Sequence, residues 1–167
     1  MTVQIPDELI WNGCKHWIPE GGPLLQAWPK RRRPTFRPTS SACWRGYIAR
    51  WIVDSSNWLR IASISTDGDT LTDELNDDVR KLFPGADTAV AAEWYSGELL
   101  VGLGEETEMP EPYVVVYPFY RMFSVQDGKV QTISNHDKNW WYEQHPDVDR
   151  TGEKAKRMFA GWSDLGH

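Results

Sequence analysis

The strongest constraint on the fold is a series of short segments rich in aromatic and β-branched residues, each bounded by turn-forming residues. Such residues fit a pleated, half-buried surface, so we expect these segments to be strands. Within Arg45–Asp54, the side chains of Tyr47, Ala49, Trp51 and Val53 share one face, which predicts a strand with one side in the core. The turn signals predict three hairpins: Arg45–Asp54 with Trp58–Ile64, Asp87–Trp94 with Glu98–Leu103, and Phe119–Val125 with Lys129–Ser134.

One internal helix is predicted over Thr70–Phe83. Thr72 is its expected cap, apolar residues recur at helical spacing, and Pro84-Gly85 follows as a stop signal. Two short helices are predicted in the tail, over Asp137–Gln144 and Thr151–Trp162. Strand runs with segregated helices are typical of an α+β fold. We therefore predict an antiparallel sheet of five to seven strands with one inserted helix and a short helical C-terminal tail.

The chain of 167 residues has the length of one ordinary domain. Residues 19–38 hold five of the eleven prolines, and proline fixes φ and removes a backbone donor, so an ordered loop or extended arm is predicted there. Residues 1–20 show no clear period. We predict a single domain over 1–167, with this arm, a β-rich core over 43–134 and a helical tail over 135–167.

Cysteine content and the first residues favour a cytoplasmic protein. Only Cys14 and Cys43 are present, and a secreted domain would often carry more. The start of the chain has neither a basic nor an apolar region typical of a signal peptide. No run approaches the roughly 20 apolar residues that span a bilayer, so no membrane partner is expected.

The motifs of metal and cofactor sites are not met. Cys14 and His16 form one loose ligand pair without a matching pair downstream. The acidic segment Asp67–Asp73 does not have the ligand spacing of a calcium loop, and no glycine-rich nucleotide loop is present. Cys43 precedes a predicted strand and is better explained by packing than by nucleophilic catalysis. The sequence therefore predicts no metal, no cofactor and no catalytic residue, and favours a protein that is not an enzyme.

Several motifs resemble those of a scattered group of small bacterial proteins of unknown function. These are Trp44-Arg-Gly-Tyr47, Trp51, Leu82-Phe-Pro-Gly85 and Trp94-Tyr-Ser-Gly-Glu-Leu99. The resemblance extends over about residues 43–133. It implies a shared compact β-rich fold, and it implies no activity or site residue.

The first functional hypothesis is a protein–protein interaction module that occludes a partner, as toxin-neutralising immunity proteins and phage inhibitors of host defence do. Ten tryptophans and six tyrosines supply side chains that are common at interfaces, and acidic residues suit a basic partner. The predicted acidic face consists of Asp67, Asp69, Asp73, Glu74, Asp77, Asp78, Glu105, Glu106, Glu108 and Glu111.

Two alternatives belong to other functional classes. A small-molecule binding protein or hydrolase, with carbohydrate as one candidate ligand, would use a Trp/Tyr-lined pocket around Glu93, Tyr95 and Glu98. A nucleic-acid-binding protein would use the arm, where a run of basic residues has an aromatic residue on either side. The arm is also a candidate protein contact, and its residues are Trp28, Lys30, Arg31, Arg32, Arg33, Phe36 and Arg37.

Overall fold

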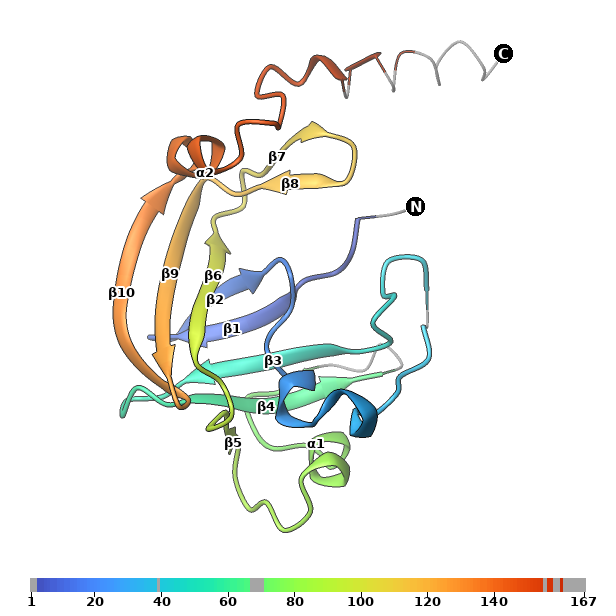
Figure 1. Ribbon diagram of the computed structural model, residues 1–167, viewed down its shortest axis with the longest axis vertical. Coiled ribbons are helices and arrows are strands. Elements are labelled where there is room, and N and C mark those ends of the chain that lie inside the picture. Colours follow the sequence, from blue (N-terminus) through green and yellow to red (C-terminus); the bar gives the residue numbers. More distant parts are fainter. Residues whose placement is uncertain (1–2, 39, 67–70, 155, 158–159, 161–167) are drawn as a thin grey trace.

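Eight strands form one curved sheet in the computed structural model, which describes residues 3–38, 40–66, 71–154, 156–157 and 160 (Figure 1). The strand order is β10-β9-β6-β2-β1-β3-β4-β5. The strands are β1 (Asp7–Trp11), β2 (Cys14–Ile18), β3 (Ile48–Val53), β4 (Leu59–Ser65), β5 (Val90–Ala91), β6 (Gly97–Leu103), β9 (Phe119–Gln126) and β10 (Lys129–Asp137). A separate two-stranded sheet consists of β7 (Glu108–Glu111) and β8 (Val114–Val116).

The α+β prediction is confirmed, but the predicted strand number and purely antiparallel pairing are wrong. β1 runs parallel to β3, so the large sheet is mixed. β1 and β2 form a hairpin around Asn12-Gly13, both with positive φ, and lie in the middle of the sheet. Asn-Gly is the strongest short hairpin signal, and it lies within residues 1–20, where we predicted no regular structure. The predicted start of the β-rich core, near Cys43, is therefore too late.

Two of the three predicted hairpins are confirmed, namely β3 with β4 and β9 with β10. The predicted pairing of Asp87–Trp94 with Glu98–Leu103 is wrong. β5 pairs with β4, whereas β6 pairs with β9 along its whole length and with β2 at one position. Pro118 lies between β8 and β9, where proline interrupts the strand run.

The internal helix is shorter than predicted. α1 (Asp77–Leu82) is capped by Asn76, whose side chain accepts a hydrogen bond from the Val79 N–H. Thr72 is not the cap, because its N–H and carbonyl are both bonded to the Ser63 hydroxyl, at 2.9 and 2.7 Å. These bonds attach the preceding loop to β4 in place of a helical turn.

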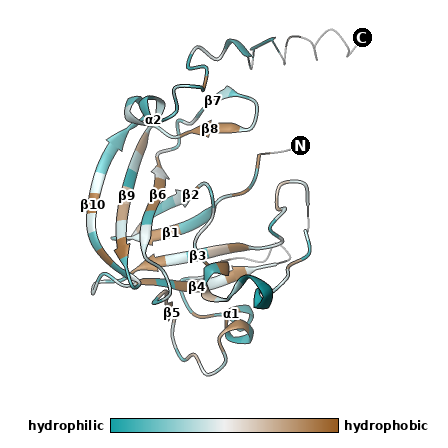
Figure 2. Cartoon of the chain, in the orientation of Figure 1, coloured by the Kyte–Doolittle hydropathy of each residue, from teal (hydrophilic) through white to brown (hydrophobic). Residues whose placement is uncertain are grey.

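The tail contains α2 (Lys138–Gln144), which confirms the helix predicted from Asp137, its capping residue. For the helix predicted over Thr151–Trp162, residues 153, 154, 156, 157 and 160 are helical. Residues 155, 158, 159, 161 and 162 of that prediction lie outside the described residues. The arm at 19–38 includes two short 3-10 helices, η1 (Leu25–Ala27) and η2 (Lys30–Arg32). Figure 2 shows η2 as strongly hydrophilic, in contrast to the hydrophobic β8.

Curvature brings the two ends of the sheet together. Trp58, at the start of β4, forms an isolated bridge with Lys129 of β10, and the Leu59 N–H donates to the Gly128 carbonyl at 2.8 Å. The enclosed face carries the main core, which includes Leu9, Ile18, Trp51, Leu59, Ile61, Val101 and Phe123. A second cluster lies beside α2 and the β7–β8 hairpin, and consists of Val116, Tyr117, Tyr120 and Tyr142.

The Asp7 carboxylate is buried and has four donors. One oxygen accepts from the Arg45 guanidinium and the Ala49 N–H, both at 2.9 Å. The other accepts from the Gly22 N–H at 2.7 Å and the Trp51 indole at 3.1 Å. A buried carboxylate is tolerated when its lone pairs are satisfied in this way. Asp7 therefore connects β1 with β3 and with the start of the proline-rich arm.

His16 is a second buried polar residue. Arg121 can only donate, so its contact with Nε2 requires that nitrogen to be unprotonated, and Nδ1 then donates to the Cys14 carbonyl at 3.1 Å. Arg121 also lies over the Trp11 ring and donates to Asn135, so contacts from β1, β9 and β10 surround the imidazole. Burial lowers the pKa of His16 and Arg121 acts in the same direction, whereas the Cys14 carbonyl opposes them.

We expect stability to fall as the pH drops below about 6.5, the ordinary histidine pKa. Because the pKa of His16 is lowered in the folded state, the unfolded chain binds more protons in this range. Urea denaturation from about pH 8 to about pH 5.5 measures the effect. His16→Gln keeps a donor and an acceptor but cannot titrate, so its stability should change less with pH. An unchanged pH dependence in this variant would exclude His16 as the cause.

Candidate functional site

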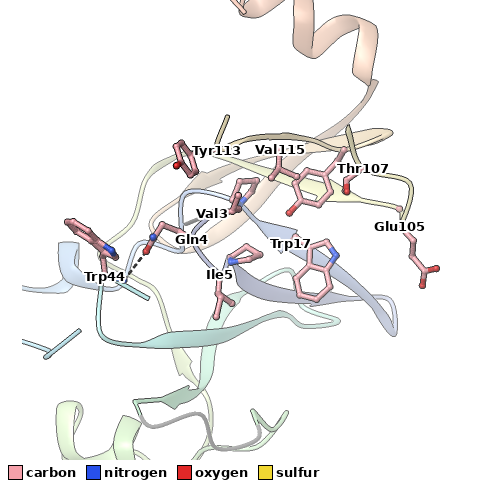
Figure 3. A pocket seen from close by; sticks show the side chains of 13 residues that line it. Val3, Gln4, Ile5, Trp17, Trp44, Glu105, Thr107, Tyr113 and Val115 are labelled. Atoms are coloured by element: carbon pink, nitrogen blue, oxygen red, sulfur yellow. Dashed lines mark hydrogen bonds between the residues drawn. The ribbon is translucent and has the colours of Figure 1, made fainter. Parts of the chain in front are cut away.

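An apolar groove of about 910 Å³ is the first candidate for a binding site. One side is the β7–β8 hairpin, and the other consists of the N-terminal segment before β1 together with the end of β2 (Figure 3). Trp44 lies at one end of the row of lining side chains, and Glu105 at the other. Trp17 lies between them. The groove therefore combines segments from three distant parts of the chain.

Strand alternation forms the hairpin wall. Tyr113, Val115 and Tyr117 are two residues apart and line the groove. Val115 and Tyr117 also belong to the second cluster, together with Val114 and Val116. Tyr113 has a φ of 67°, which is uncommon for a residue other than glycine and places it at the tight turn between β7 and β8. Bulky side chains at alternate positions thus form one wall of the groove.

The opposite wall is held by backbone contacts. The Gln4 side chain accepts from the Trp44 N–H and donates to the Ser41 carbonyl, both at 2.8 Å. The Ile5 N–H donates to the Ala42 carbonyl, also at 2.8 Å. Residues 41–44 are thereby fixed against the N-terminal segment. Trp44 is positioned through its backbone, and its indole is left 62 % exposed.

Exposed apolar side chains gather at this groove. Five large hydrophobic residues are exposed among those described, and three of them line it: Ile5 at 42 %, Trp44 at 62 % and Tyr113 at 44 %. The other two, Met109 and Phe119, do not line it. Single exposed apolar residues are ordinary, but a cluster around a concave surface is typical of a binding site.

Among the described residues, Glu105 is the only charged one that lines the groove, and the exposed Glu106 follows it. The other two acidic residues of this segment are engaged elsewhere. Glu108 pairs with Lys138 and accepts from the Tyr142 hydroxyl, and the Lys138 ammonium holds the pKa of Glu108 below its usual range. Glu111 pairs with Lys154 at 2.8 Å. These two carboxylates connect the β7–β8 hairpin to the tail.

The described candidates outside this segment, Asp73, Glu74, Asp77 and Asp78, lie in α1 or shortly before it, and α1 is at the opposite end of the molecule from β7 (Figure 1). The described acidic candidates therefore do not form one acidic face. Three are in ion pairs: Asp73 with Arg50, Asp77 with Arg80, and Asp78 with Lys81. Glu74 is exposed. Asp67 and Asp69 lie outside the described residues.

The arm divides into packed aromatic residues and exposed basic ones. Trp28 packs on Phe83 and Phe36 on Tyr47, with ring centroids 5.2 and 4.6 Å apart. Arg33 is half-buried, and its Nε lies 3.5 Å from the Trp28 carbonyl. The exposed residues are Lys30, Arg31, Arg32 and Arg37. The two rings predicted to stack on bases thus pack against the protein instead.

A smaller pocket of about 380 Å³ adjoins the groove, and Pro19 and Val115 line both cavities. Tyr95 and Glu98 line it, whereas Glu93 does not, so the predicted Glu93–Glu98 pair is not brought together there. The Tyr95 hydroxyl donates to the Glu98 carbonyl at 2.9 Å. Burial raises the pKa of Tyr95, and the Glu98 charge adds to the effect.

Sequence reasoning missed the groove itself, although signals for it were present. Trp44 belongs to a motif that we interpreted only in terms of the fold. Tyr113-Val-Val-Val-Tyr117 has aromatic residues at both ends of an alternating segment. The Asn12-Gly13 turn would have placed Trp17 on a strand.

The described residues contain no group of three or more His, Cys, Asp or Glu side chains arranged to hold a metal ion. Within the same residues, no helix has the length and hydrophobicity of a membrane span. Comparisons of this chain with protein-family models, with curated proteins and with solved structures found no match.

Proposed function

We propose that the protein is a non-catalytic interaction module whose groove binds an apolar segment of a partner protein. The observation that carries this proposal is the clustering of Ile5, Trp44 and Tyr113 around one apolar cavity. Covering these side chains removes apolar surface from water, which is the main driving force of association. Aromatic residues at the centre of such patches commonly contribute most of the binding energy.

A protein segment fits the groove better than a compact small molecule does. Trp44 lies at one end of the groove and Glu105 at the other, so a ligand that contacts both must extend along the row of lining side chains. Glu105 favours a partner that carries positive charge at its end of the groove. Immunity proteins and phage inhibitors remain examples of this class of function.

The alternative of nucleic-acid binding through the arm is less well supported. Trp28 and Phe36 are packed against the domain, and base stacking needs exposed rings. The alternative of a small-molecule pocket remains an outcome of the experiment below.

Trp44→Ala should weaken binding of linear peptides by about tenfold, which corresponds to about 1.4 kcal/mol. The peptides are first selected from a phage-displayed library on the immobilised wild-type protein, and their affinities are then measured by calorimetry. Phe119→Ala is the matched control, because Phe119 is 56 % exposed but lies outside the groove lining. It should leave the affinity unchanged.

Two outcomes would contradict the proposal. Equal losses in Trp44→Ala and Phe119→Ala would show that the selected peptides bind elsewhere or bind without specificity. A library that yields no binder, together with a rise in melting temperature on adding small aromatic compounds, would favour the small-molecule alternative.

A further inference from the structure

The smaller pocket adjoins the groove but has a different chemical character. Among the described residues, its lining contains two acidic residues, Glu20 and Glu98, one histidine, His145, and no lysine or arginine. Both acidic residues are exposed, and no ion pair or side-chain hydrogen bond is found for either carboxylate within the described part of the chain. The pocket therefore carries uncompensated negative charge.

Three aromatic residues, Tyr95, Tyr120 and Trp141, also line this pocket. Trp141 of α2 stacks on Tyr120 of β9 and on His145, with centroid distances of 6.3 and 4.0 Å. Tyr95 lines the pocket as well, and its hydroxyl is held by the Glu98 carbonyl. These contacts fix the rings before any ligand arrives, which lowers the entropy cost of binding.

Carboxylates beside fixed aromatic rings recognise organic cations. A guanidinium group pairs with carboxylates and also stacks on aromatic faces, and it is less strongly hydrated than an ammonium group. The pocket volume of about 380 Å³ is ample for one long side chain. Phosphate, nucleotide or acidic peptide ligands would be repelled by the two carboxylates.

We propose that this pocket receives an arginine side chain from the same polypeptide segment whose apolar residues occupy the groove. The inference rests on the proposed function, and it adds the chemistry of the partner. The proximity of the two cavities carries it, because Pro19 and Val115 line both, so a segment bound in the groove lies next to the pocket. The preferred partner segment thus has an apolar or aromatic residue followed or preceded at short distance by arginine.

The probes are synthetic peptides with a Leu-Trp anchor and one arginine, separated by glycine spacers of increasing length and made in both orders. Each has a twin in which citrulline, neutral and nearly the same shape, replaces arginine. We expect the citrulline twin of the best peptide to bind the wild-type protein about tenfold more weakly. In the Glu20→Gln/Glu98→Gln variant, the arginine and citrulline peptides should bind about equally.

Glu93→Gln is the control, because Glu93 is an exposed carboxylate close in sequence to Glu98 that does not line the pocket. It should keep the tenfold preference for arginine. Equal binding of the twins to the wild-type protein, with affinity still lost in Trp44→Ala, would overturn this inference and leave the proposed function standing. A preference that survives in Glu20→Gln/Glu98→Gln would overturn it too, since the arginine would then bind elsewhere. If no peptide binds, or if Trp44→Ala has no effect on binding, the proposed function fails and this inference with it.

Discussion

Replacing Asp7 with asparagine should lower the free energy of unfolding by about 3 kcal/mol, the cost typical of breaking a buried charge pair. The carboxylate is fully buried and accepts from four donors, one of which is the Arg45 guanidinium. An asparagine side chain has one acceptor oxygen, so its amide nitrogen would face donors on one side of the site. The Arg45 charge would also lose its counter-ion.

Urea denaturation at neutral pH measures this loss, and Asp77→Asn provides the control. The Asp77 side chain is 89 % exposed and forms only a surface pair with Arg80, so its replacement should change stability by less than about 0.5 kcal/mol. A similar small change in Asp7→Asn would mean that the hydrogen bonds of the carboxylate contribute little net stability. In that case, other contacts must hold β1 beside β3.

Local signals were sufficient for the elements whose partners are adjacent in sequence. The hairpin of β3 and β4 follows from alternating apolar residues around a turn, and the hairpin of β9 and β10 from Asp127-Gly128. α2 follows from Asp137 as its capping residue. In each of these cases, residues that are close together in the sequence determine the structure.

Long-range order could not be predicted in this way. The parallel pairing of β1 with β3 joins residues about forty positions apart, and it is supported by the bonds of Asp7 to Arg45, Ala49 and Trp51. Nothing within residues 1–20 identifies those partners. The start of α1 was misplaced for a similar reason, because Ser63 of β4 binds the backbone of Thr72 and prevents an earlier helical turn.

The candidate site could be predicted only in part from the sequence. An excess of tryptophan predicted that some rings serve an interface, yet it could not distinguish Trp44, which is exposed, from Trp51, which is buried. Acidic residues were equally ambiguous, since Glu105 lines the groove whereas Glu108 and Glu111 are tied to the tail. Which role a residue takes depends on the element packed beside it, and that element is distant in sequence.

Gly102 determines how closely the hairpin wall of the groove approaches the large sheet. It pairs with Tyr120 of β9, and it forms the single bridge of β6 to Trp17 of β2. A Cβ atom added there would lie 2.4 Å from the ring of Tyr117, at the ring atom nearest the backbone. Tyr117 is buried, and its N–H donates to the Tyr120 hydroxyl at 2.9 Å, so the ring has little room to move.

Gly102→Ala should therefore lower the free energy of unfolding by about 3 kcal/mol, the upper end of the usual cost of overpacking. The reason is steric, so removing the opposing ring should relieve it. In the double variant Gly102→Ala/Tyr117→Ala, the loss should be smaller than the sum of the two single losses by at least about 1 kcal/mol, as measured by urea denaturation. Additive losses would show that the methyl group disturbs the β2–β6–β9 pairing itself. Because Tyr117 lines the groove, Gly102→Ala should also weaken peptide binding under conditions where the variant is still folded.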